Sequence, residues 1–387
     1  MRGVWLTLAL SLILVLSSCN TSYSDLESQA GSWQFLGLPQ GNTLDALGPI
    51  PSMALNSLGN PGIAYYNPSG PFSPPSFAYH DGTAWIGNSN LDFRNYNVNH
   101  SIRGIDVAFD LQDRPVVAFT KWFAGIGGFV YVKRLNAATG RWKEHDVISL
   151  SGYPDKIQLK MANNIPIIAF TSGNVSTLEV KRLSCTTCTS WISYGEPESG
   201  INSFSLALDK TKNPVLAYGK SGVGMIVKKW DSIQGQWIFL ANPLNAYAPA
   251  MDTDTNGHPV VVWRESNFIY TKRWNGSTWQ SIGNVVTDNA VGTSSYIPSL
   301  TLDNEGNPYV LWQGAGNALY VKHWKAAENR WRFVGPNPIS NVSGYKVGNS
   351  ATIAWRNNSL VATWRRAPIT LGNISYSGGI FSKRYIP

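Results

Sequence analysis

Between Ser299 and Gly335 the chain alternates between four short apolar runs and three polar turns. The runs cover residues 299–302, 309–312, 319–324 and 331–334, and the first turn contains Asp303, Gly306 and Pro308. In such turns Asp caps its own backbone, Gly adopts a positive φ, and Pro rigidifies the exit. Apolar runs of this length bounded by turns predict four β-strands, denoted a, b, c and d in chain order.

The same pattern recurs at intervals of about 50 residues, which indicates a repeat architecture. The proline that ends the a–b turn recurs as Pro61, Pro115, Pro166, Pro214, Pro259 and Pro308. An aromatic residue follows each of these by four positions, as Tyr65, Phe119, Phe170, Tyr218, Trp263 and Trp312. A seventh copy lacks the proline and aligns on Trp364.

This seventh copy ends at strand c, because the chain stops shortly after Phe381–Tyr385. The missing strand d is found at the other end, where residues 31–37 match residues 329–335. A strand taken from the N-terminus leaves no unpaired edge between the first and last repeats. We therefore predict an all-β fold over residues 31–387, a seven-bladed β-propeller of four-stranded antiparallel blades whose last blade is closed by the N-terminal strand.

Each predicted strand d carries one tryptophan, and large rings fill the wedge between twisted sheets. We expect these residues to pack between blades: Trp33, Trp85, Trp142, Trp191, Trp237, Trp279 and Trp331.

The N-terminus combines Arg2, an apolar run over residues 4–16 and small residues before Cys19, which is the pattern of an export signal. The run is too short to span a bilayer as a helix. Leu16-Ser17-Ser18-Cys19 resembles the lipobox of bacterial lipoproteins. The resemblance implies a signal peptide over residues 1–18, lipidation of Cys19, a tether over residues 19–30, and a place in the bacterial cell envelope at the outer membrane or outer cell surface. The alternative is an ordinary cleaved signal.

The other two cysteines, Cys185 and Cys188, fall at the tip of the predicted c–d hairpin of blade 3. In an exported protein this spacing favours a disulfide. A zinc site needs a second pair, which the sequence lacks, and haem attachment needs a histidine where Thr189 stands.

The formal net charge of +8 originates in the repeat, because strand c carries a basic pair in six blades. The pairs are Lys133-Arg134, Lys181-Arg182, Lys228-Lys229, Lys272-Arg273, Lys322-His323 and Lys383-Arg384. They form either a girdle for an anionic polymer or side chains whose stems pack on tryptophan and whose heads lie in water. Because we expect the chain to be exported, we predict no nucleic acid partner.

Long loops on one face indicate where a ligand binds. The d–a and b–c connections emerge on this face, here named the loop face. Its b–c loops are long at residues 67–75, 121–128 and 365–379, in blades 1, 2 and 7, and the d–a loops at 38–50 and 88–103 enlarge the same sector. The predicted ligand-binding residues are Tyr66, Arg94, Tyr96, Arg103, Lys121, Trp122, Phe123 and Arg365.

Sugar rings pack on aromatic side chains, and arginines hold hydroxyls or carboxylates. Two alternatives remain. The loops can vary simply because nothing constrains them, and Trp122 can plug the central channel.

No reaction chemistry is evident in the sequence, so we predict no catalytic residue, metal or cofactor. The five histidines lack ligand spacing, and there is no nucleophile elbow or phosphate loop. Residues 252–257 begin like a calcium loop, but no carboxylate closes the ligand set. The c–d hairpin ending in Gly276-Ser277-Thr278-Trp279 resembles the Asp-box of sialidase-type propellers only distantly, and that likeness transfers no catalytic residue. The whole repeat resembles those of uncharacterised bacterial surface propellers.

The sequence therefore predicts a monomeric, lipid-anchored, non-enzymatic module that binds a glycan or protein on the loop face of blades 7, 1 and 2. One alternative is a glycan-active hydrolase or lyase, which needs two carboxylates in one pocket, and the sector offers only Asp92 and Asp106. The other is a structural subunit of an envelope complex, which needs a broad apolar patch.

Overall fold

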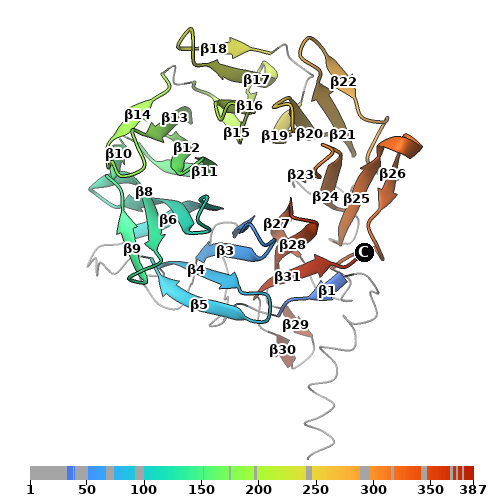
Figure 1. Ribbon diagram of the computed structural model, residues 1–387, viewed down its shortest axis with the longest axis horizontal. Helices are drawn as coiled ribbons and strands as arrows, with labels where there is room; N and C mark the ends of the chain where they lie inside the picture. Colours follow the sequence, from blue (N-terminus) through green and yellow to red (C-terminus); the bar gives the residue numbers. More distant parts are fainter. Residues whose placement is uncertain are drawn as a thin grey trace, which may run out of the picture.

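Seven antiparallel sheets stand around a central axis like the blades of a propeller, as Figure 1 shows. The computed structural model describes residues 33–37, 39, 51–66, 74–91, 100–150, 152–173, 176–195, 198–240, 246–287, 297–314, 318–340, 347–366, 369–371, 374–376 and 379–387. The predicted fold class is confirmed. Among these residues no helix is long and apolar enough to cross a membrane.

In blades 1 to 6, strands a to d follow one another in chain order from the axis outward. Blade 1 holds β2 (Ser52–Leu55), β3 (Pro61–Tyr66), β4 (Pro75–His80) and β5 (Trp85–Asn90). Blade 2 holds β6 (His100–Phe109), β7 (Pro115–Phe123), β8 (Gly127–Asn136), β9 (Arg141–Glu144) and the extra strand β10 (Ile148–Leu150). Blade 3 holds β11 (Pro154–Ala162), β12 (Ile165–Ser172), β13 (Thr177–Leu183) and β14 (Trp191–Ser193). Blade 4 holds β15 (Ile201–Leu208), β16 (Pro214–Lys220), β17 (Gly224–Asp231) and β18 (Gln236–Phe239).

The remaining blades follow the same plan. Blade 5 holds β19 (Tyr247–Thr253), β20 (Pro259–Glu265), β21 (Phe268–Trp274) and β22 (Trp279–Ser281). Blade 6 holds β23 (Ser299–Leu302), β24 (Pro308–Gln313), β25 (Leu319–Lys325), the 3-10 turn η2 (Ala326–Glu328) and β26 (Arg330–Phe333). Blade 7 holds β27 (Val347–Arg356), β28 (Ser359–Arg366) and β31 (Gly379–Tyr385), and its b–c connection carries a small hairpin of β29 (Ile369–Leu371) and β30 (Ile374–Tyr376).

The N-terminal strand closes the ring, as predicted. β1 (Trp33–Phe35) pairs antiparallel with β31, with Trp33 opposite Tyr385, so the last sheet has the order β1-β31-β28-β27. The outer edge of blade 7 is thereby covered by the other end of the described chain.

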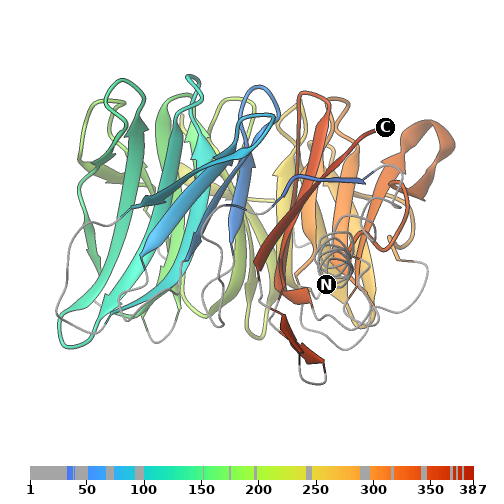
Figure 2. The same cartoon turned by 90° about the horizontal axis from the view of Figure 1, so that it is seen from below.

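The predicted long b–c loop of blade 2 is wrong. β7 continues through Phe123 and β8 starts at Gly127, so the connection is a tight turn in which Gly125 has a φ of +76°. The aromatic and β-branched residues on both sides of this turn favour an extended ladder over a loop. The result is a long β7–β8 hairpin, which emerges on the same side of the ring as β29–β30, the lower side of Figure 2.

The hydrophobic core is divided among the interfaces between blades. One cluster joins Leu311 and Val321 of blade 6 to Ile353 and Trp364 of blade 7, and corresponding clusters lie between the other neighbours. The strand-b aromatics are buried, as predicted. Tryptophans of strand d also bridge blades, since the Trp331 Nε1–H donates to the carbonyl of Ile282 at 3.2 Å.

Backbone N–H groups on the innermost strands find acceptors on the preceding blade. The Leu159 N–H donates to a carboxylate oxygen of Asp106 at 2.6 Å, and the Leu206 N–H donates to Gln158 Oε1 at 2.7 Å. Ser205 accepts from the Met251 N–H at 3.0 Å in the same way. An edge strand has unpaired donors, and these side chains satisfy them while linking successive blades.

The structure gives the repeated basic pairs a structural role that the sequence did not predict. Five of the twelve residues are buried and the other seven are half-buried, and in four blades the second member pairs with the Asp of its own a–b turn, as in Arg134–Asp110 at 3.7 Å and Lys229–Asp209 at 3.0 Å. Arg134 also donates to the carbonyl of Asn164, in the a–b turn of the next blade. The pairs therefore tie neighbouring turns together, because a buried cation needs local acceptors.

Candidate functional site

Three exposed or half-buried side chains meet on the loop face where blade 2 contacts blade 3. The ring of Trp122 lies 4.6 Å from that of Tyr153, centre to centre, at an angle of 38°. The guanidinium carbon of Arg103 lies 4.7 Å from the centre of the Tyr153 ring, and Arg103 donates a hydrogen bond to the Tyr153 hydroxyl. This Arg103–Trp122–Tyr153 cluster combines aromatic faces with a cation.

Features of the local backbone determine the direction in which these side chains point. The β6–β7 pairing shifts register between Ile102 and Ile105, which is a bulge that turns Arg103 outward. Gly104 follows, and a Cβ there would lie 2.8 Å from the carbonyl oxygen of Asp155, so only glycine allows blade 3 to approach this closely.

Tyr153 is placed by the fifth strand of blade 2. β10 pairs with β8, with Leu150 opposite Gly128, and leads the chain along the hairpin toward Tyr153. A Cβ on Gly128 would lie 2.6 Å from the carbonyl oxygen of Gly152. The missing side chain therefore makes room for the turn that holds Tyr153 beside Trp122.

Hydrogen bonds within and around the cluster change the acidity of the Tyr153 hydroxyl. Hydrogen bonds from Arg103 and then Ser101 lower the pKa of the Tyr153 hydroxyl, because both stabilise its ionised form. Asp155, two residues further along, is exposed. The phenolic oxygen of Tyr153 can itself accept a hydrogen bond. Cationic donor, acceptor and aromatic face thus lie together at one edge of the ring.

Lys121 and Phe123 do not share this surface. They are 1% and 2% exposed, and the Lys121 Nζ lies 5.7 Å from the centre of the Phe123 ring. Successive side chains of a strand point to opposite faces, so Trp122 points outward while its two neighbours point into the blade. Their prediction as loop residues is wrong, since both lie buried in β7, and their contact with a ligand stays a prediction.

The other predicted ligand-binding residues are not part of the cluster. Tyr66 ends β3 in blade 1 and Arg365 lies in β28 of blade 7, each half-buried on its own blade. Arg94, Tyr96 and Cys19 lie outside the described residues. The structure therefore places the exposed cluster at blades 2 and 3, displaced from the predicted centre at blades 7, 1 and 2.

Tyr153 was missed by the sequence analysis. Its signal is weak, since it is a single aromatic residue between Gly152 and Pro154 in a short d–a connection. Only the pairing of β10 with β8 brings that connection beside Trp122.

A second polar group lies in a small cleft between blades 3 and 4. Glu198 accepts hydrogen bonds from Lys228 at 2.7 Å and from Lys220 and Tyr218 at 3.1 Å each. The cleft is lined by Leu178, Val180, Gly195, Glu198, Leu216, Tyr218, Lys228 and Trp237. Burial alone would raise the pKa of Glu198, but the bonds from Lys228 and Lys220 outweigh it and the pKa is lowered. These hydrogen bonds therefore connect blade 3 to blade 4.

The turn that resembled a calcium loop is closed by its own side chain. Asp254 Oδ1 accepts from the backbone N–H of Asn256 at 2.9 Å and of His258 at 3.0 Å, and its other oxygen lies 3.6 Å from Nε of Arg273. Within the described ranges, no three His, Cys, Asp or Glu side chains are grouped so that they can hold a metal ion.

Comparisons with known proteins support the propeller fold and nothing more specific. No family model matches the chain, and no curated protein matches it. The structure of YCF48 bound to a D1 peptide is similar at a TM-score of 0.55, with 11% identity over 92% of this chain and 97% of that one. A protein of unknown function from Dyadobacter fermentans gives a TM-score of 0.51, with 9% identity over 91% of this chain and 98% of that one.

A fucose-binding lectin shows a weaker likeness. The Aleuria aurantia lectin in complex with Fucα1-6GlcNAc gives a TM-score of 0.49, with 12% identity over 76% of this chain and 97% of that one. At such identities the likeness extends to the propeller fold and to no particular site.

Proposed function

We propose that this chain is a non-enzymatic binding module of the bacterial cell envelope, anchored through Cys19, that holds a glycan on its loop face at blades 2 and 3. The proposal rests on one observation, the Arg103–Trp122–Tyr153 cluster near the tip of the long β7–β8 hairpin. Aromatic rings placed at a rigid surface beside cationic and polar groups are typical of ligand sites.

The chemistry of the cluster favours a hydroxyl-rich ligand. Sugar rings have apolar C–H faces that pack on an indole, while their hydroxyls need donors and acceptors around the rim. A guanidinium has five N–H donors, so Arg103 retains donors beyond the one directed at Tyr153. The phenolic oxygen of Tyr153 can accept a hydrogen bond at the same place.

A hydrolase or lyase requires two carboxylates, or a carboxylate with a tyrosine or histidine, close together in one pocket. Asp155 is exposed and follows Tyr153 by two residues, whereas the Asp106 carboxylate already accepts hydrogen bonds from Leu159, Val107 and Ser52. Burial raises the pKa of Asp106. Its contacts therefore favour a structural role for Asp106 over a catalytic one.

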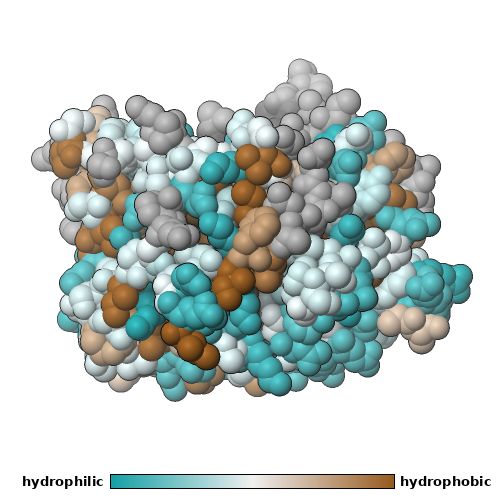
Figure 3. Space-filling model, turned by 90° about the horizontal axis from the view of Figure 1, so that it is seen from above, coloured by the Kyte–Doolittle hydropathy of each residue, from teal (hydrophilic) through white to brown (hydrophobic). Residues whose placement is uncertain are grey.

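A structural subunit would present a broad apolar face. In the described part of the chain, the exposed apolar side chains are dispersed. Leu58 and Leu111 lie in a–b turns, Ile126 lies in the b–c turn on the opposite face, and Phe239 and Phe333 lie on the outer strands. The side of the ring drawn in Figure 3 shows one narrow apolar band near its centre and smaller apolar patches, all bordered by polar residues. This dispersion favours a small ligand over a large docked partner.

The test is a glycan array probed with the purified wild type, Trp122→Ala and Phe239→Ala. Phe239 is exposed on strand d of blade 4 and serves as the matched aromatic control. We expect Trp122→Ala to lose the bound glycans with little change in melting temperature, and Phe239→Ala to bind as the wild type does. Equal binding by all three proteins, or no glycan bound by the wild type, would contradict the proposal.

A further inference from the structure

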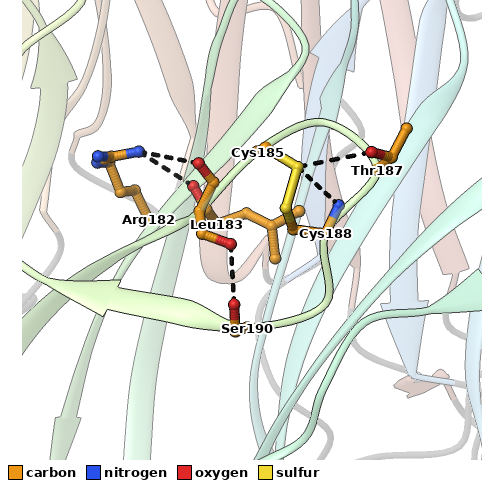
Figure 4. The surroundings of a disulfide bond; sticks show 7 residues. Arg182, Leu183, Cys185, Thr187, Cys188 and Ser190 are labelled. Atoms are coloured by element: carbon orange, nitrogen blue, oxygen red, sulfur yellow. Dashed lines mark hydrogen bonds between the residues drawn. A yellow bond between two sulfur atoms is a disulfide. The ribbon is translucent and has the colours of Figure 1, made fainter.

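The hairpin that carries Cys185 and Cys188 differs from the other c–d hairpins of the ring. It connects β13 to β14, on the face opposite the loop face, and both cysteines are half-exposed. They form a disulfide across two intervening threonines, as Figure 4 shows. Nothing in the proposed glycan site uses this bond.

The hairpin does not need the disulfide to hold its shape. Below the tip, the Ser184 N–H donates to the carbonyl of Ser190 at 3.0 Å, and the two serine hydroxyls are 2.9 Å apart. The side chain of Asp81, Asn136, Asp231 or Asn275 accepts backbone N–H groups in the corresponding hairpin of four other blades, without any disulfide. Turn closure is therefore available from hydrogen bonds alone.

Contacts with blade 2 hold the hairpin independently of the sulfurs. The Trp191 Nε1–H donates to the carbonyl of Asp146 at 2.8 Å, and the Asp146 N–H donates to the carbonyl of Thr189 at 3.2 Å. His145 packs edge-on against Trp191, with ring centres 6.5 Å apart. Opening the disulfide thus leaves the hairpin attached at its base and on its Cys188 side.

The hydrogen bonds around Cys185 Sγ favour a negative charge on this sulfur. The Cys188 N–H donates to Cys185 Sγ at 3.1 Å, and the Thr187 hydroxyl lies 3.5 Å from the same sulfur (Figure 4). Hydrogen bonds to sulfur stabilise a thiolate, which is the form that attacks disulfides and leaves from them. Arg182 adds a cation at the hairpin base, where it donates to the carbonyls of Leu183 and Ser184 at 3.4 Å.

We infer that the Cys185–Cys188 pair is a thiol–disulfide exchange site that reacts with the dithiol or disulfide of a partner protein. The inference combines a two-residue spacing, half-exposed sulfurs, hydrogen bonds directed at Cys185 and a hairpin that is closed without the bond. It is independent of glycan binding.

The exchange balances as two thiolate displacements. In the reduced pair, the Cys185 thiolate attacks a disulfide of the partner, forms a mixed disulfide and releases one partner thiolate. Cys188, after losing its proton, attacks Cys185 Sγ, releases the second partner thiolate and restores the Cys185–Cys188 bond. Two electrons pass to the partner's sulfurs, which take up the two protons that the pair releases, and a partner dithiol reverses the sequence.

The first experiment measures reduction of the folded protein. The full-length chain carries Cys19→Ser, so that only the pair contributes thiols, and is incubated with dithiothreitol at pH 7 before trapping with a polymer maleimide. We expect both cysteines to become reactive within minutes while the melting temperature changes by no more than about 2 °C, since the loop that the disulfide closes is very short. Reduction that occurs only after unfolding, or that unfolds the protein, overturns the inference.

The second experiment tests the hydrogen bond to Cys185. In a Cys19→Ser, Cys188→Ala background, the reaction of Cys185 with oxidised glutathione is compared for Thr187→Val and the adjacent Thr186→Val. We expect Thr187→Val to react about threefold more slowly. Loss of the Thr187 hydrogen bond should reduce the fraction of Cys185 in the thiolate form about tenfold, while the remaining thiolate is more nucleophilic and restores part of the rate. Thr186→Val should react as the background does, and equal rates for the two variants would contradict the mechanism.

Discussion

The indole Nε1–H of Trp33 donates a hydrogen bond to the carbonyl of Val334 at 2.8 Å, although 301 residues separate the two in the sequence. Trp33 is buried in the cluster that joins blades 6 and 7, and its strand pairs with β31. The contact shows that the N-terminal strand both completes blade 7 and attaches it to blade 6.

Replacing Trp33 by alanine should destabilise the whole ring. We expect the free energy of unfolding to fall by about 3–5 kcal/mol, as for other large aromatic side chains removed from a core. Trp33→Phe keeps most of the buried area and should lose about 1 kcal/mol, since it removes one of the two hydrogen bonds to the Val334 carbonyl and leaves the one from Asn337 Nδ2 at 3.2 Å. Urea denaturation measures both, with the exposed Gln34→Ala as control. An unchanged midpoint for Trp33→Ala would contradict the closure.

The contacts made by the basic pairs of strand c should contribute to the free energy of unfolding. Arg134→Met removes an ion pair to Asp110, whose side chain is fully buried, and a hydrogen bond to the next blade. We expect a loss of about 2 kcal/mol, below the usual figure for a broken buried pair, because Arg114 remains 2.7 Å from the same carboxylate.

Arg141 is the matched control, since it lies on the exposed end of β9. Arg141→Met should leave the unfolding midpoint unchanged. Equal midpoints for Arg134→Met and Arg141→Met would show that the repeated pairs do not tie the turns together.

Glu198 should make the stability of the ring depend on pH. Its pKa is lowered in the folded state, so its contribution is present above the ordinary glutamate pKa of about 4.3 and is lost as the pH falls through the folded-state value. Glu198→Gln should reduce the free energy of unfolding by about 1 kcal/mol at pH 7, a small effect because solvent screens the cleft.

The difference between Glu198→Gln and the wild type should shrink toward zero in acid, where the wild-type carboxylate is itself protonated. Thermal unfolding at a series of pH values measures it. Glu179→Gln, a carboxylate beside a single lysine in the same blade, should change the midpoint less. A stability difference between Glu198→Gln and the wild type that does not change with pH would contradict the role of an ionised Glu198 in connecting the two blades.

Cys19 is expected to carry the lipid anchor. Cys19→Ser should leave the protein unlipidated, so that it no longer partitions into the detergent phase with the membrane fraction. Identical fractionation of variant and wild type would contradict the lipobox interpretation.

The repeat and its closure were predictable from the sequence because they depend on local chemistry that recurs. The Asp or Asn that caps the a–b turn in blades 1, 2, 4, 5 and 6 does so through its own side chain, as Asp303 does for the N–H groups of Glu305 and Asn307. Strand b is apolar on both faces, and the match between Trp33 and Trp331 identifies the closing strand. Such signals act within a few residues or repeat in every blade.

The surface cluster and the role of the basic pairs were decided only by the tertiary structure. Trp122 was expected in a loop, but the ladder between β7 and β8 extends past it, and strand alternation separates it from Lys121 and Phe123. Tyr153 reaches Trp122 because β10 folds back on β8, and Arg134 meets Asn164 because the next blade's turn lies beside it. These contacts depend on register and on the approach of neighbouring blades, which the composition of any one strand does not determine.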